Sequence, residues 1–237
     1  MRSAVVVFPG SNCDRDVEKA LLYMETGPVD MVWHDGEDFP HRPDLVILPG
    51  GFSYGDYLRS GALAAKSRIM KAVRSYADSG GLVLGICNGF QILTEAGLLP
   101  GTLLPNASLR FICRPAYLRV ERNDTPFTCS FPEGEIVQFP IAHHEGLFFL
   151  PPDELDELEK ERRVVFRYAC PSSGEAGEAY SPNGSLNGVA GIINERGNVL
   201  GLMPHPERAT VRGLIWGVDG RNVWQSLGEH FEVWEGK

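Results

Sequence analysis

The first half of the chain alternates short apolar runs with stretches in which apolar residues recur every three or four positions. The apolar runs lie at residues 4–8, 29–33, 44–48 and 82–86. Runs of this length, rich in β-branched residues, are typical of strands buried on both faces of a sheet. Helical spacing follows the first run at Val17, Ala20, Leu21 and Met24, and it returns over about residues 62–78. Ser11 or Asn12 could cap the first of these helices.

The second half has shorter β-rich segments. We expect antiparallel strands at residues 117–120, 135–139 and 164–168, and a hairpin formed by residues 189–193 and 199–203. The acidic stretch 153–161 is typical of a solvated helix face, and Asp219-Gly220 opens a last helix with Val223, Leu227 and Phe231 inward. The whole pattern predicts an α/β fold: a mostly parallel sheet with helices on both faces and antiparallel additions. No linker divides it, so we expect one domain over residues 1–237.

The run at residues 82–86 leads into the most informative segment, Gly-Ile-Cys-Asn-Gly at residues 85–89. A strand, a tight turn with glycine two residues either side of Cys87, and a helix form the pattern of a nucleophile elbow. The helix N-terminus favours negative charge and therefore the thiolate form. A buried structural cysteine is the alternative. We interpret Cys87 as a nucleophile.

A thiol nucleophile requires a base and a group that orients the base. The segment Met-Pro-His-Pro-Glu at residues 203–207 follows a predicted strand, and its two prolines restrict the backbone around His205. In an extended segment, residues two apart project on the same side, so Glu207 can hold the His205 imidazole. A rigid surface turn with an idle histidine is the alternative.

Acyl chemistry also requires donors for the developing oxyanion. The Asn88 amide lies in the first turn of the helix after Cys87. Gly50 and Gly51 follow another predicted strand, at the same carboxyl edge of the sheet. Because glycine has no Cβ, its backbone N–H can approach a ligand closely. Pro-Gly-Gly taken alone is also compatible with a plain loop.

Net charge, cysteine content and the length of the apolar runs exclude several classes of function. The chain has 22 basic and 31 acidic residues, a formal net charge of −9, which argues against nucleic acid or an anionic membrane as the main partner. Five scattered cysteines suggest neither a disulfide framework nor a metal site. No signal segment opens the chain and no apolar run approaches the ~20 residues of a membrane span, so we expect a cytoplasmic protein.

Three motifs together resemble the class I (triad) glutamine amidotransferases: Pro49-Gly50-Gly51, the elbow at residues 85–91, and His205-Pro206-Glu207. Residues 8–14, 51–61, 141–146 and 183–192 further resemble the glutaminase subunits of phosphoribosylformylglycinamidine synthase, the PurQ family, over nearly the whole chain. The resemblance implies a flavodoxin-like amidotransferase fold. It also shows one departure, because His144 stands where that family usually has glycine.

The resemblance also implies roles. Cys87 would attack glutamine and form a thioester, His205 would transfer protons, and Glu207 would orient His205. The Gly51 and Asn88 amides would form the oxyanion hole, beside Gly50, and Phe52 and Gln91 would line the glutamine pocket. Ammonia would pass to a PurL-like synthetase subunit, bridged by a small PurS-like subunit. No Gly-x-x-x-x-Gly-Lys-Ser/Thr loop occurs here, so ATP and magnesium are expected on the synthetase and no cofactor on this chain.

Some features allow more than one interpretation. The loop at residues 52–61 mixes aromatic and charged residues, which suits either protein contact or structural packing. Cys13 follows a turn at the start of a helix, which would activate it somewhat, but it has no evident His-Glu partner. His144 could change glutamine contacts or face solvent. Two other functions stay open: a free-standing cysteine hydrolase, and a binding module without catalysis.

Overall fold

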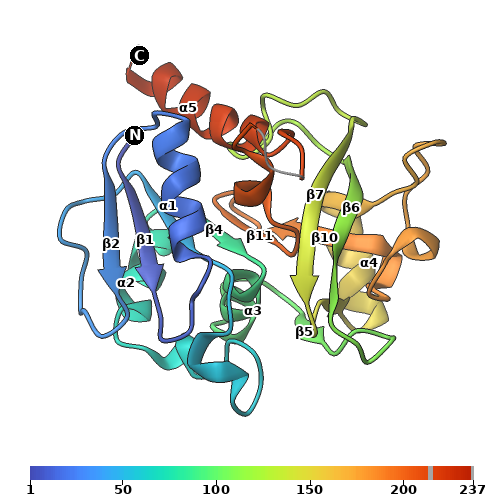
Figure 1. Ribbon diagram of the computed structural model, residues 1–237, viewed down its shortest axis with the longest axis horizontal. Helices are drawn as coiled ribbons and strands as arrows, with labels where there is room; N and C mark the ends of the chain where they lie inside the picture. Colours follow the sequence, from blue (N-terminus) through green and yellow to red (C-terminus); the bar gives the residue numbers. More distant parts are fainter. Residues whose placement is uncertain (213–215, 236–237) are drawn as a thin grey trace.

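The fold is built around a mixed β-sheet. The computed structural model describes residues 1–212 and 216–235. Within these residues nine strands form one sheet in the order β2-β1-β3-β4-β11-β10-β9-β6-β7 (Figure 1). The first five run parallel: β1 (Ser3–Val7), β2 (Val29–Trp33), β3 (Leu45–Leu48), β4 (Leu82–Ile86) and β11 (Val199–Leu202). The predicted parallel sheet is confirmed.

The antiparallel additions extend one side of this sheet. They are β10 (Val189–Ile193), β9 (Val164–Tyr168), β6 (Ile112–Val120) and β7 (Ile136–His143). A separate pair, β5 (Thr102–Leu104) with β8 (Leu147–Phe149), was not expected from the sequence. β6 and β7 are longer than predicted and continue through Pro115 and Pro140. Pro115 precedes the part of β6 that pairs with β9, and Pro140 lies on the edge strand β7, where proline is tolerated.

Five α-helices accompany the described strands: α1 (Asp14–Tyr23), α2 (Met70–Asp78), α3 (Asn88–Glu95), α4 (Pro152–Lys160) and α5 (Arg221–Glu235). Figure 1 shows α1 in front of the parallel strands and α2 behind them. Because both faces are covered, every residue of β3, β4 and β11 is buried. In α5 the predicted inward residues Val223 and Leu227 are fully buried, and Phe231 packs against the core.

Short 3₁₀ turns link these elements: η1 (Ser53–Asp56), η2 (Ala64–Lys66), η3 (Glu178–Tyr180), η4 (Leu186–Gly188) and η5 (Pro206–Ala209). The single helix predicted over residues 62–78 is wrong. η2 ends before Ser67, whose ψ of 152° is extended, and α2 begins only at Met70. Tertiary contacts interrupt the helix: the Tyr54 hydroxyl hydrogen-bonds Ser67 Oγ, and the Ile69 N–H donates to the His34 carbonyl.

The predicted cap of the first helix is also wrong. Cys13, not Ser11 or Asn12, occupies the N-cap position of α1, and no side chain caps this helix. The Ser11 hydroxyl instead accepts a hydrogen bond from the Phe8 N–H. This arrangement turns Cys13 toward the interior, where its side chain is 3% exposed.

The topology gathers loops at one edge of the sheet. β1, β3, β4 and β11 run parallel, so the loops after them, which contain Cys13, Gly50, Cys87 and His205, share the carboxyl edge. β7 approaches the same edge, because the His205 N–H donates to the Pro140 carbonyl. No helix within the described residues combines the length and the apolar character that a membrane crossing requires. One domain over residues 1–237 stays a prediction.

Candidate active site

Cys87 lies at the turn between β4 and α3 in a strained backbone conformation, with φ 51° and ψ −104°. A non-glycine residue with positive φ costs about 1–3 kcal/mol and persists only where its surroundings fix it. Here the Cys87 N–H donates to the Leu202 carbonyl at 2.8 Å, and its carbonyl accepts from the Gln91 N–H at 3.2 Å. Those bonds tie the elbow to both β11 and α3. The geometry is that of a nucleophile elbow.

The neighbouring glycines make this turn possible. A Cβ on Gly89 would lie 1.9 Å from the Leu48 carbonyl oxygen, and a Cβ on Gly85 would lie 2.7 Å from the Gly89 backbone. Neither position has room for a side chain. The start of α3 therefore packs directly on the end of β3, and this close packing places Cys87 beside the loop that carries Gly50 and Gly51.

His205 and Glu207 form a buried pair in the loop after β11. His205 Nδ1 lies 2.6 Å from Glu207 Oε1, and the two residues are 1% and 2% exposed. The short distance and the near-complete burial are typical of a charge-assisted hydrogen bond. His205 Nε2 makes no well-aligned hydrogen bond within the described residues, which leaves it available for the Cys87 thiol.

Electrostatics favour a charged imidazole. Burial disfavours the imidazolium and lowers the pKa of His205. The Glu207 carboxylate, together with Cys87 through charge and hydrogen bonding, outweighs this effect of burial. The pKa of His205 is therefore raised above its ordinary value. The loop that carries His205 thus brings together the three residues predicted as a triad. A cysteine beside an imidazole that a carboxylate orients is suited to attack on an acyl carbon.

Gly50 and Gly51 lie against this group. A Cβ on Gly50 would be 2.7 Å from His205 Cε1, and a Cβ on Gly51, whose φ is 135°, would be 2.7 Å from the Asn12 nitrogen. Asn88 begins α3, where backbone N–H groups have no intrahelical acceptor. Its side-chain oxygen accepts from the Ser53 N–H at 3.2 Å, which fixes the loop after β3 relative to the elbow.

The residues predicted to line the substrate pocket differ in environment. Gln91 is buried, accepts a hydrogen bond from Asn88 Nδ2 at 2.8 Å and donates one to the Glu145 carbonyl at 2.6 Å. Its amide therefore ties α3 to residues 143–146. Phe52 is 42% exposed and its ring centroid lies 6.3 Å from that of Phe111. Contact of either residue with glutamine stays a prediction.

Comparison with known proteins identifies the family. A sequence profile described as "CobB/CobQ-like glutamine amidotransferase domain" matches residues 1–235. A PurQ subunit of phosphoribosylformylglycinamidine synthase from Rhodopseudomonas palustris is 52% identical over 230 residues, covering 97% of this chain and 98% of that protein. The chain belongs to the PurQ family of glutamine amidotransferases. It is therefore an enzyme, a glutaminase subunit of that synthase.

Other PurQ relatives agree. The PurQ subunit from Nitrobacter winogradskyi is 52% identical and covers 98% of this chain and 99% of its own. A solved structure entitled "Structure of PurLQS from Thermotoga maritima" contains a chain that matches with a TM-score of 0.84 and 47% identity, over 97% of this chain and 98% of that one. The flavodoxin-like α/β amidotransferase fold predicted from the sequence is confirmed.

His144, the departure from the PurQ pattern, is exposed, whereas its neighbour His143 is buried. Sequence reasoning gave His143 no role. Its Nδ1 lies 3.0 Å from Asn106 Oδ1, and a Cβ on Gly146 would lie 2.4 Å from its ring. Burial, together with the charge of His205, lowers the pKa of His143 to about 3. His143 is thus a neutral hydrogen-bonding residue near His205, and the His-His-Glu-Gly motif was the available signal.

Arg208 is a second residue that the sequence did not single out. Its Nη2 donates to Cys13 Sγ at 2.9 Å, and its Nε pairs with Asp16 at 3.2 Å. Ligand atoms of Cys13, His205 and Glu207 lie within 4.8 Å of one another, close enough to share a metal ion. However, a cation there would displace Arg208 from the sulfur and Glu207 from His205, so these contacts favour a hydrogen-bonded cluster.

The expected activation of Cys13 is wrong. Burial, together with the charge of Glu207, raises the pKa of its thiol above the ordinary value, despite its place at a helix N-terminus. The sulfur is therefore a neutral thiol. It can donate to Asn12 Oδ1 at 3.8 Å while accepting from Arg208.

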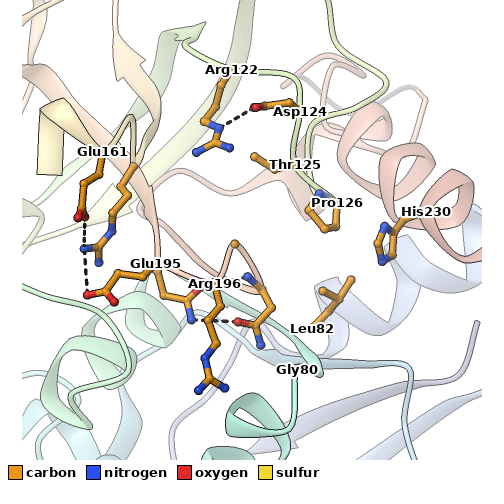
Figure 2. A pocket seen from close by; sticks show the side chains of 14 residues that line it. Gly80, Leu82, Arg122, Asp124, Thr125, Pro126, Glu161, Glu195, Arg196 and His230 are labelled. Atoms are coloured by element: carbon orange, nitrogen blue, oxygen red, sulfur yellow. Dashed lines mark hydrogen bonds and ion pairs between the residues drawn. The ribbon is translucent and has the colours of Figure 1, made fainter.

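A cavity of about 750 Å³ lies at the opposite edge of the sheet, near the starts of β4 and β11 (Figure 2). Its arginines already have partners: Arg122 pairs with Asp124 at 2.7 Å, and Arg163 pairs with Glu161 at 3.1 Å. The nucleophile elbow is not among its lining residues. This cavity is separate from the residues predicted as the triad.

Proposed function

We propose that this PurQ-family chain hydrolyses the side-chain amide of glutamine through a thioester on Cys87. The observation that carries the proposal is the convergence of a strained elbow cysteine with a buried His205–Glu207 pair at one sheet edge. Family membership supports glutamine as the substrate. Cys87, His205 and Glu207 are the residues to which we assign catalysis.

In the proposed reaction, the Cys87 thiolate attacks the amide carbon and the carbonyl oxygen becomes an oxyanion. We assign the backbone N–H groups of Gly51 and Asn88 to that oxyanion. Removing one such donor typically costs about 10²–10³ in rate. The C–N bond then breaks as the His205 imidazolium gives its proton to the departing nitrogen, which leaves as ammonia. His205 next takes a proton from water, which attacks the thioester and releases glutamate.

We further propose that ammonia passes to a PurL-like synthetase subunit, with a PurS-like subunit bridging the two chains. The solved PurLQS structure from Thermotoga maritima supports these partners. There ammonia would amidate formylglycinamide ribonucleotide at the expense of ATP. ATP and magnesium are assigned to the synthetase, and this chain needs no cofactor for hydrolysis through a thiol.

Glutamate release tests this proposal. The purified chain would be assayed with glutamine alone and then with the synthetase and bridging subunits, ATP and formylglycinamide ribonucleotide. We expect strong stimulation by the partners and loss of activity in Cys87→Ala, with Cys113→Ala, an exposed cysteine on β6, as the matched control. Hydrolysis that ignores the partners would instead indicate a free-standing hydrolase.

A further inference from the structure

Glu207 is a buried carboxylate with incomplete hydrogen bonding. Its Oε1 bonds His205, but its Oε2 has no hydrogen-bond partner within the described residues. An ionised carboxylate in such surroundings requires compensating charge, since desolvation otherwise favours the neutral acid. A neutral Glu207 would no longer hold an imidazolium at Nδ1. The contact with His205 therefore depends on what stabilises the buried charge of Glu207.

Arg208 is positioned to supply that charge. Its Nε lies 4.0 Å from Glu207 Oε1, too far for a hydrogen bond but near enough for electrostatic stabilisation in a buried site. The guanidinium does not turn in to bond Glu207 directly. It is held by two groups at the start of α1: Asp16 at 3.2 Å and Sγ of the N-cap residue Cys13 at 2.9 Å.

Cys13 is the less expected of these two anchors. It is 3% exposed, and its N–H faces the Gly50 carbonyl at 3.4 Å, so it lies between the loop after β3 and the loop after β11. Burial and the charge of Glu207 keep it protonated. Its sulfur therefore acts as a fixed hydrogen-bond acceptor for Arg208 and not as a nucleophile.

We propose that Cys13, Asp16 and Arg208 form a positioning unit that holds a guanidinium beside Glu207 and thereby stabilises the carboxylate charge that orients His205. The proposal rests on the assignment of Cys87, His205 and Glu207 as the triad. None of the three residues of this unit touches the reacting atoms; each acts through Glu207.

The sign of the pH effect follows from the groups around the triad. Glu207 acts on His205 from the same loop, Cys87 acts on it from the elbow, and the neutral His143 lies near it on β7. Cys13 and Asp16 lie at the start of α1. Loss of the Arg208 charge leaves negative groups around Glu207 without their nearby cation. The negative charge that holds the His205 imidazolium is then less stabilised, so the acidic limb of the activity profile, which requires this charged pair, moves upward.

The experiment measures kcat and KM for glutamine against pH in the complex with the partner subunits. For Arg208→Met we expect the acidic limb of kcat to rise by about half a pH unit or more, with KM little changed. Arg208→Lys should restore part of the shift. Cys13→Val, which removes only the sulfur acceptor, should move the limb in the same direction by less, and Cys13→Ser, which keeps an acceptor, should stay close to wild type.

Arg122→Met is the matched control, because Arg122 is a partly buried arginine that is ion-paired with Asp124 and lines the cavity at the opposite edge of the sheet (Figure 2). A wild-type profile in Arg208→Met, or an activity loss equal at every pH, would overturn the positioning role. Cys87→Ala separates the two proposals. If glutamate release survives it, the triad assignment fails; if Cys87→Ala is inactive and Arg208→Met has an unshifted profile, only the positioning role fails.

Discussion

Two buried cysteines lie close to the same imidazole, and Glu207 distinguishes them. Burial and the negative charge of Glu207 raise the pKa of Cys13, whereas the same carboxylate stabilises the His205 imidazolium beside Cys87. Backbone geometry separates them too. Cys87 has φ 51° at the elbow, whereas Cys13 has the negative φ of −99° at an ordinary helix start. At the residue scale, reactivity follows from placement and not from residue type.

Glu207→Gln tests the orienting carboxylate. Glutamine preserves the shape of the side chain but not its charge, so the His205 imidazolium loses its main stabilising partner and its pKa falls. We expect kcat for glutamine to fall about 10²-fold or more, with KM changed little. Steady-state glutamate release measures this. Activity within about twofold of wild type would contradict the role of Glu207.

The lowered pKa of His143 predicts that the stability of the folded chain depends on pH. Its pKa falls from the ordinary 6.5 to about 3 in the folded chain, so the unfolded chain binds the extra proton first as pH falls. The stability that neutral His143 provides is therefore complete above about pH 6.5 and decreases toward pH 3. At pH 5 the loss is about 2 kcal/mol, at about 1.4 kcal/mol per pH unit.

The measurement is the free energy of unfolding in urea at pH 7.5 and pH 5, for wild type and His143→Gln. Glutamine can donate to Asn106 as His143 Nδ1 does, but it does not titrate. The variant should lose less stability between the two pH values than wild type does. Equal losses would show that His143 is not the group responsible.

At the scale of elements, the elbow depends on β3, β4 and α3 packing without side chains at their contact. A Cβ on Gly89 would meet the Leu48 carbonyl at 1.9 Å, and backbone cannot move away as a flexible side chain can. We expect Gly89→Ala to destabilise the chain by more than about 2 kcal/mol, measured by urea unfolding.

The matched control is Gly228→Ala in α5, where a Cβ meets nothing within 4 Å. There alanine should be neutral or stabilise the chain by up to about 1 kcal/mol, because glycine is a weak helix former. Similar effects at the two positions would mean that the close contact of α3 with β3 does not limit the elbow.

The elements that the sequence predicted are those with strong local patterns. The apolar runs at β1, β3 and β4 and the Gly-Ile-Cys-Asn-Gly turn have strong local preferences, so the sheet edge could be inferred from the sequence. The break before α2 could not, because Tyr54 and His34 impose it from distant segments. Likewise, Arg208 carries no motif of its own; its importance comes from Cys13 and Asp16, almost two hundred residues earlier.

At the scale of the whole molecule, apolar side chains on two loops remain uncovered. Tyr57 and Leu58 are 74% and 89% exposed on the loop after β3, and Leu109 is 73% exposed on the loop before β6. Exposed aromatic and aliphatic residues of this kind are typical of protein contact sites. This favours protein contact over structural packing for the loop at residues 52–61.

Leu58→Ser tests that contact. It should leave the unfolding free energy of the isolated chain within about 0.5 kcal/mol, because Leu58 is already in solvent. In the complex it should weaken subunit binding about tenfold, measured as the partner concentration that half-stimulates glutamate release. Leu22→Ser, at a 58% exposed position on α1, is the control that should bind normally. Equal behaviour of both variants would argue that this loop is not a contact surface.

The central claim is that Cys87 is the nucleophile for glutamine. The most direct measurement is labelling with 6-diazo-5-oxonorleucine, a glutamine analogue that alkylates the attacking thiol, followed by peptide mapping by mass spectrometry. We predict one adduct per chain, on Cys87, prevented by excess glutamine and absent from Cys87→Ala. An adduct on Cys13, or glutamine hydrolysis that persists in Cys87→Ala, would contradict the claim.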